Sequence, residues 1–229
     1  MPFVSKVTGN QIIKAGTLLM LGHSLDSIKK TTNYLNSSTN KVAIKKAIFP
    51  WSRFPAEDTM LGPEMKATGE VLGIGRSFGV ALNKAYAAAG VEINENEKGI
   101  FVSLSDQEKP NFIKIVKTYS DLGFKIYSTY GTGEYLKNSE INSTIVGRAD
   151  ETFPTSLTIL QDKLISLVIN TPTFANEYTD GWKIRRLSHE TGVAVVSSVR
   201  EAEAFLKAFL ETTKSCLLYT SDAADEGSS

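Results

Sequence analysis

The chain has 229 residues, and its 25 lysine and arginine residues balance 25 aspartate and glutamate residues. A formal net charge of zero gives no overall attraction to nucleic acid or to an anionic membrane, so we expect neither as a partner. The single cysteine, Cys216, excludes an internal disulfide. No apolar run approaches the roughly 18 residues of a membrane span and the N-terminus lacks a signal-peptide pattern, so we expect a cytoplasmic protein.

The first part of the chain predicts a mixture of helices, strands and irregular segments. Phe3 and Val4 read as a short extended entry. Apolar spacing and turn residues then predict helices over 11–21 and 77–89, a strand over 42–49, and loops over 31–41 and 51–63.

Two features of this part resemble functional motifs without having their spacing. Gly69, Gly73 and Gly75 lack the Walker and GxGxxG patterns, so we expect a tight turn leading into the second helix. The acidic side chains nearby have no recognised ligand spacing, so we expect no metal site. They are Glu57, Asp58, Glu64 and Glu70.

From Gly99 onward, strand and helix patterns alternate regularly. The expected strands are 100–104, 125–128, 143–146, 164–170 and 193–197. The expected helices are 110–122, 133–137, 156–161, 181–190 and 199–210. Such alternation indicates an α/β fold whose parallel sheet is covered by helices on both faces. A ligand would bind in the crevice at the carboxyl ends of the strands.

Polar and cationic residues follow several of these strands. The segment from Ser128 to Gly133 opens a helix, and its free N–H groups, threonines and glycines suit a phosphate or carboxylate, although an ordinary capped turn has the same pattern. Lys109 and Arg148 follow two other strands and could neutralise an anion. Asn170-Thr171-Pro172-Thr173 ends a fourth strand, either in the crevice or as a capped loop.

A basic cluster lies on the helix expected over 181–190. It comprises Lys183, Arg185 and Arg186. Because the two consecutive arginines point in different directions on a helix, we expect at least one of them at the surface.

Three segments, in this order and spacing, resemble the C-terminal end of carbamoyl-phosphate synthase large chains. The first is Pro2-Phe3-Val4-Ser5-Lys6-Val7-Thr8-Gly9, the second Phe49-Pro50-Trp51-Ser52-Arg53-Phe54, and the third Leu61-Gly62-Pro63-Glu64-Met65-Lys66-Ala67-Thr68-Gly69-Glu70-Val71-Leu72-Gly73. The resemblance covers about 2–210. The region after Gly99 is similar to the family's regulatory domain, which has a methylglyoxal-synthase-like fold.

The resemblance implies three divisions of the chain. Residues 1–93 would be an α+β remnant of an ATP-grasp domain, 94–212 a Rossmann-like methylglyoxal-synthase-like allosteric domain, and 213–229 a disordered and possibly artefactual tail. The parent enzyme makes carbamoyl phosphate for arginine and pyrimidine synthesis. It uses ATP with Mg or Mn, a glutamine amidotransferase small chain and contacts with other large chains. The residues that hold ATP and metal would precede Met1, so we expect no cofactor and no synthase activity in this polypeptide, and no catalytic residue in it.

The resemblance also implies an effector site for a phosphorylated nucleotide such as UMP or IMP. The positions that match it are Lys109, Thr129, Gly131, Thr132, Arg148, Asn170, Thr171, Thr173, Ser197 and Ser198. Arg148 stands where the family usually has Lys, which keeps the charge with a planar fork. The run after it, Asp150-Glu151-Thr152-Phe153-Pro154, departs from the family's Glu-Gly-Arg-Pro.

Two other functions remain open at this point. A free-standing methylglyoxal-synthase-type lyase would act on dihydroxyacetone phosphate with a carboxylate base, but Asn170 stands where the related lyases have an Asp, leaving Asp150 as a candidate acid. Alternatively, the domain would serve as an assembly surface, as related regulatory domains do.

Overall fold

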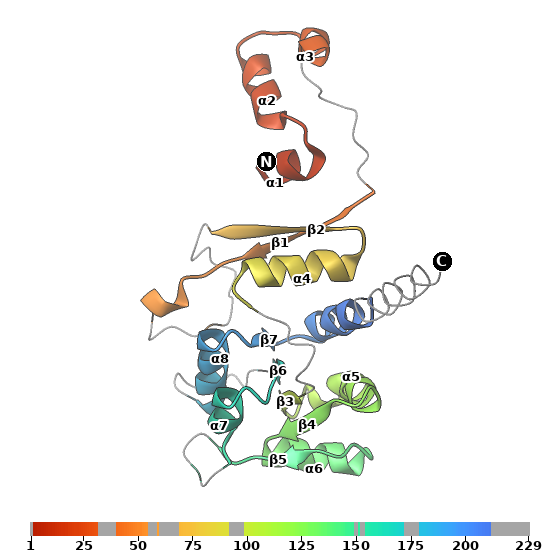
Figure 1. The fold of residues 1–229 in the computed structure, drawn as a ribbon, viewed down its shortest axis with the longest axis vertical. Helices are drawn as coiled ribbons and strands as arrows, with labels where there is room; N and C mark the ends of the chain where they lie inside the picture. Colours follow the sequence, from red (N-terminus) through yellow and green to blue (C-terminus); the bar gives the residue numbers. More distant parts are fainter. Residues whose placement is uncertain are drawn as a thin grey trace, which may run out of the picture.

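The structure is a computed structural model that describes residues 2–31, 40–54, 59, 69–91, 99–148, 151, 154–171 and 179–211. Figure 1 shows three short helices at one end, a two-stranded sheet with one helix in the middle, and a larger sheet with its helices at the other end. The first elements are α1 (Pro2–Thr8), α2 (Ile12–Met20), α3 (Leu25–Thr31), β1 (Val42–Ala47), the 3-10 helix η1 (Trp51–Arg53), β2 (Glu70–Gly75) and α4 (Phe78–Ala88).

Most of the helices and strands expected in this part are present. The helix expected over 11–21, the strand over 42–49 and the helix over 77–89 are confirmed as α2, β1 and α4. The extended entry at Phe3 and Val4 is wrong, because both residues lie in α1, which continues until Gly9 adopts the left-handed φ of 73°. Helix α3 was not expected.

The expected tight turn at the glycine-rich segment is also wrong, because Gly73 and Gly75 lie in β2. This strand pairs antiparallel with β1 and packs against α4. A Cβ on Gly73 would lie 2.0 Å from the carbonyl oxygen of Ala81, and one on Gly75 would lie 2.6 Å from the nitrogen of Ala81. The two glycines are two residues apart and share one face of the strand, so they let the helix backbone approach the strand closely.

The larger sheet confirms the expected α/β fold. Its elements are β3 (Gly99–Ser103), α5 (Lys109–Asp121), β4 (Lys125–Ser128), α6 (Tyr130–Asn138), β5 (Thr144–Ile145), α7 (Ser156–Gln161), β6 (Leu167–Asn170), α8 (Asp180–Glu190) and β7 (Ala194–Val196), followed by a helix over 199–211. All five strands are parallel, in the order β5-β4-β3-β6-β7.

Alternate residues of the strands enter two separate hydrophobic cores, as parallel strands covered on both faces require. One core joins the sheet to α5, α6 and the helix over 199–211. It includes Ile100, Val102, Phe112, Val116, Leu136 and Phe205. The other core joins the opposite face to α7 and α8, and it includes Phe101, Ile159, Leu160, Val168 and Ile184. The carboxyl ends of the strands therefore emerge between two layers of helices.

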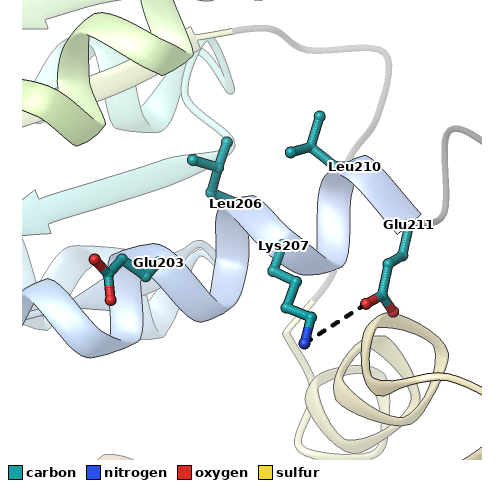
Figure 2. A pocket seen from close by; sticks show the side chains of 5 residues that line it. All are labelled: Glu203, Leu206, Lys207, Leu210 and Glu211. Atoms are coloured by element: carbon teal, nitrogen blue, oxygen red, sulfur yellow. Dashed lines mark ion pairs between the residues drawn. The ribbon is translucent and has the colours of Figure 1, made fainter.

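The last helix also contacts the middle part of the molecule through the Glu211 side chain. Figure 2 shows Glu203, Leu206, Lys207, Leu210 and Glu211 along this helix, with Glu211 next to α4. The Glu211 carboxylate accepts a hydrogen bond of 2.7 Å from the Gly79 N–H in the first turn of α4, and it lies 3.9 Å from the Lys207 amine. The residues assigned to two domains from the sequence are thus in direct contact. The division at 93/94 stays a prediction, and its boundary and the segment 213–229 lie outside the described residues.

Candidate functional site

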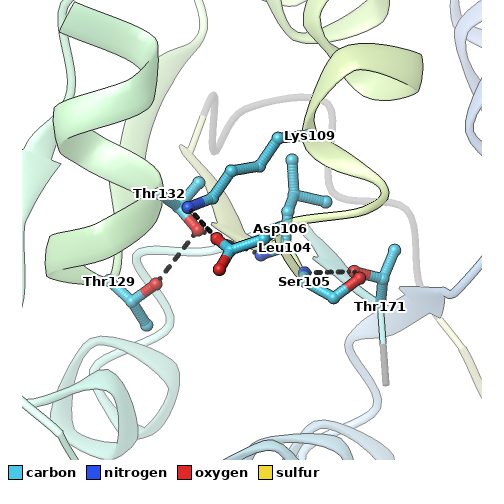
Figure 3. Close-up of polar contacts among 7 residues, drawn as sticks. All are labelled: Leu104, Ser105, Asp106, Lys109, Thr129, Thr132 and Thr171. Carbon is cyan, nitrogen blue, oxygen red and sulfur yellow. Dashed lines mark hydrogen bonds and ion pairs between the residues drawn. The ribbon is translucent and has the colours of Figure 1, made fainter. Parts of the chain in front are cut away.

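The strand order makes the carboxyl ends of β3 and β6 a candidate position for a ligand. Chain connections leave β3 toward β4 on one side and leave β6 toward β7 on the other, so the order reverses between these two neighbours. In open parallel sheets, ligands bind at such a switch point beyond the carboxyl ends of the strands. The loops after the two strands are held together there, because the Ser105 N–H donates to Oγ1 of Thr171 at 2.8 Å (Figure 3).

Thr132 lies in the first turn of α6, which follows β4 on the other side of β3 from β6, and 1% of its surface is exposed. Its hydroxyl oxygen accepts the Leu104 N–H at 3.0 Å and the Thr129 hydroxyl at 3.2 Å. With both lone pairs engaged, Thr132 can offer a ligand only its hydroxyl proton. The contact fixes the end of β3 to the start of α6 (Figure 3).

Helix α6 begins at Tyr130, three residues before the predicted start at Gly133. Thr129 takes the N-cap position, but its side chain makes no capping hydrogen bond. The backbone N–H groups of the first turn, including that of Gly131, therefore have no threonine cap. Gly133 instead allows close packing, because a Cβ there would lie 2.7 Å from Oγ of Ser128. This helix end suits an anion.

Lys109 lies beside the first turn of α6. Its amine is 3.8 Å from where a Cβ of Gly131 would be, and 5.8 Å from the centre of the Tyr135 ring. The Lys109 side chain is only 12% exposed, and its amine forms an ion pair of 2.6 Å with Oδ1 of Asp106. The hydrogen bond from Lys109, together with its charge, lowers the pKa of the Asp106 carboxyl. Sequence reasoning missed Asp106, although its position three residues before a helical lysine is a usual spacing for ion pairs.

Asn170 is 2% exposed, and its Oδ1 accepts a hydrogen bond of 2.6 Å from Nη1 of Arg185. Arg186 donates to the carbonyl oxygens of Trp51 and Phe54, each at 2.7 Å. The expectation that one of these arginines lies at the surface is wrong, because they are 5% and 8% exposed. Both can be buried because each guanidinium has fixed oxygen partners.

The structure does not place every predicted site residue near Lys109, Thr132 and the start of α6. The Arg148 side chain is 72% exposed and lies 3.9 Å from the carboxylate of Asp180. Ser197 and Ser198 bind the Glu201 carboxylate, and Oγ of Ser198 accepts the Glu201 N–H, so both serines act at the start of the last helix. Thr173 lies outside the described residues, as does Asp150.

A cavity of about 320 Å³ lies elsewhere, between β1, α4 and the start of the last helix. Lys46 and Tyr86 line this cavity, and the Lys46 amine is 4.0 Å from the centre of the Tyr86 ring. His189 and Glu201 line it from the other side and belong to the larger sheet with its helices, 99–211, which we call the sheet domain. Burial lowers the pKa of Lys46, an effect that the Glu201 charge opposes. The cavity is bounded by both parts of the molecule.

Among the described residues, every helix is too short or too polar to span a membrane. The same residues contain no group of three or more His, Cys, Asp or Glu side chains arranged to hold a metal ion.

Comparison with known proteins identifies the family of the larger sheet. Residues 111–197 match the MGS-like domain family. The chain is 35% identical over 226 residues to the C-terminal section of the carbamoyl phosphate synthase large chain of Aquifex aeolicus, an alignment that covers 93% of this chain and 42% of that relative. It is 36% identical over 207 residues to the large chain of a Nostoc species, covering 90% of this chain and 18% of the relative.

The same enzyme from Methanothermobacter thermautotrophicus is 35% identical over 207 residues, covering 90% of this chain and 19% of the relative. The chain therefore contains an MGS-like domain and is related to carbamoyl phosphate synthase large chains, of which it spans less than half the length. These findings confirm the resemblance predicted from the sequence.

Proposed function

We propose that the sheet domain is a regulatory module that binds a phosphorylated nucleotide, UMP or IMP, beyond the carboxyl ends of the neighbouring strands β4, β3 and β6. The observation that carries this proposal is the convergence of three anion-binding features: the Lys109 amine, the Thr132 hydroxyl and the uncapped first turn of α6. They come from two segments of the chain, the start of α5 and the start of α6, and a shared function accounts for their meeting.

The chemistry of this cluster fits a phosphate group. Backbone N–H groups at a helix N-terminus donate to phosphate oxygens, and the helix dipole favours negative charge there. Lys109 adds a full positive charge, and Thr132 adds one hydroxyl proton. Asn170 and Thr171, at the end of β6, would contact the ligand from the opposite side of the crevice, with Arg148 and the two serines at greater distance.

The names of the relatives extend the proposal to the parent protein. We place this module in the large chain of a glutamine-hydrolysing carbamoyl phosphate synthase of arginine and pyrimidine synthesis, in the cytoplasm. In that setting, ATP and Mg or Mn would be used by other parts of the large chain, with a glutamine amidotransferase small chain and further large chains as partners. The polypeptide alone would have no synthase activity, and turnover of ATP by it would contradict this.

Calorimetric titration of the chain with UMP and with IMP tests the nucleotide site. For the better ligand, Lys109→Ala should weaken binding about 10- to 100-fold, because a hydrogen bond to a charged group contributes about 1.5 to 3 kcal/mol. The matched control is Lys117→Ala, since Lys117 is an exposed lysine on the same helix. Equal affinity of Lys109→Ala and the unaltered chain would refute the assignment.

The lyase alternative receives no support from the end of β6. Asn170 occupies that position, and its amide oxygen is held by Arg185. An amide cannot abstract a proton as a carboxylate does. Formation of methylglyoxal from dihydroxyacetone phosphate by the chain would favour the lyase over the regulatory module.

A further inference from the structure

The Lys109 amine already has an anionic partner in the free protein. Oδ1 of Asp106 lies 2.6 Å from it, and Figure 3 shows the carboxylate beside the amine, close to Thr132. The two side chains differ greatly in exposure, at 12% for Lys109 and 93% for Asp106. The carboxylate therefore meets an otherwise enclosed amine from the solvent side.

The enclosed side of the amine is bounded by α6. Gly131 in its first turn and the Tyr135 ring are the neighbours there. A ligand anion that reaches the amine from solvent thus arrives where the Asp106 carboxylate lies. It must displace that carboxylate or bind next to a like charge.

We propose that Asp106 acts as an intramolecular competitor of the ligand phosphate and thereby lowers the affinity of the site for anions. This inference rests on the proposed nucleotide site. In this role Asp106 does not bind the ligand. It raises the ligand concentration that is needed to fill the site.

The charges of the free site support this role. Lys109 and Asp106 together carry no net charge, so a phosphate meets less attraction than it would at an unpaired lysine. Asp106 stays ionised near neutral pH, because the hydrogen bond and charge of Lys109 lower the pKa of its carboxyl. The residue lies in the turn 106–108 before α5, outside any helix or strand. Moving its side chain therefore breaks no backbone hydrogen bond of a helix or sheet.

Asp106→Asn tests the inference, because it removes the charge and keeps the shape. Calorimetry on the full chain with UMP and with inorganic phosphate should show binding about two- to fivefold tighter than in the unaltered chain, the range expected from losing an exposed ion pair. The affinity of Asp106→Asn should also fall more steeply with added NaCl, because its site keeps an uncompensated positive charge. Asp121→Asn removes one exposed carboxylate at the other end of α5 and should change neither quantity.

The outcomes distinguish a failure of the proposed role of Asp106 from a failure of the proposed nucleotide site. Unaltered affinity and salt dependence in Asp106→Asn, while the unaltered chain binds UMP, would overturn the role of Asp106 alone. Equal gains in Asp106→Asn and Asp121→Asn would also overturn it, since they would reflect overall charge. Failure of every variant to bind UMP, IMP or phosphate would overturn both the inference and the proposed function.

Discussion

Nη2 of Arg186 donates to the carbonyl oxygen of Trp51 at 2.7 Å, across 135 positions of the sequence. The same guanidinium donates to the carbonyl oxygen of Phe54 and pairs with Glu190 at 3.1 Å. A buried arginine of α8 thus holds the segment around η1 against the sheet domain. The Trp51 and His189 rings, with centres 5.9 Å apart, extend the same contact.

Arg186→Met should destabilise the protein by about 2 to 4 kcal/mol, because the buried guanidinium is lost and the carbonyl groups of Trp51 and Phe54 lose a charged donor that methionine cannot replace. Urea unfolding followed by circular dichroism measures the change. Arg76→Met is the matched control, since Arg76 is exposed and its replacement should stay within about 0.5 kcal/mol. Equal stability of the two variants would show that the contact contributes nothing.

Gly73→Ala should destabilise the protein by about 3 kcal/mol or more. Its Cβ would lie 2.0 Å from the carbonyl oxygen of Ala81 and 2.6 Å from the nitrogen of Ala85, and neither backbone atom can yield without moving α4 away from β2. Gly16→Ala in α2 is the control: nothing lies within 4 Å of its Cβ, so it should stabilise by about 0.5 kcal/mol. Thermal unfolding of both variants gives the comparison, and a stable Gly73→Ala would contradict the close packing.

Glu211→Gln should remove a pH-dependent part of the stability. The Gly79 N–H, the Ser77 hydroxyl and the Lys207 charge lower the pKa of the Glu211 carboxyl below 4.5, against the opposing effect of burial. A group with a lowered folded pKa stabilises the fold above its unfolded pKa, and this contribution is lost as the pH falls through the folded value.

At pH 7, Glu211→Gln should therefore be less stable by about 0.5 to 1 kcal/mol, the usual size of a carboxylate effect at a helix N-terminus. The difference should vanish in acid, below the lowered pKa. Urea unfolding between pH 7 and pH 3 measures it, with the exposed Glu203→Gln of the same helix as control. A difference that persists unchanged in acid would exclude the charge of Glu211 as the cause.

Arg185→Lys should weaken UMP binding about three- to tenfold. Lysine keeps the charge but loses the planar fork that holds Oδ1 of Asn170 at 2.6 Å, so the Asn170 amide would be less well oriented toward the crevice. Calorimetry gives the affinity, and unfolding in urea shows whether the fold is intact. Wild-type affinity in a folded Arg185→Lys would mean that the orientation of Asn170 does not matter for the ligand.

The parallel sheet could be predicted from the sequence, because buried parallel strands and amphipathic helices alternate with clear periods. Lys109, Thr132 and Asn170 are assigned to the site by their places after successive strands, and that assignment stays a prediction. Thr171 was found in the same way, but the Ser105 N–H already engages its hydroxyl oxygen.

Other features depend on contacts that no local pattern reports. The glycines of β2 lie where they do because α4 packs on them, and the burial of Arg186 depends on carbonyl groups of a distant segment. The pairing of Asp106 with the enclosed Lys109 amine could not be predicted either, because an aspartate three residues before a lysine is usual on solvent-exposed helices. In each case the partner became identifiable only in three dimensions.

Arg185 and Arg186 are consecutive residues of α8, and their guanidinium groups reach opposite neighbours. One binds Asn170 at the end of β6, and the other binds the carbonyl groups around η1. Because consecutive side chains are about 100° apart around a helix, no single rotation of α8 can move one arginine and leave the other in place. The helix is therefore fixed at two places at once, to the end of β6 through Arg185 and to the segment around η1 through Arg186.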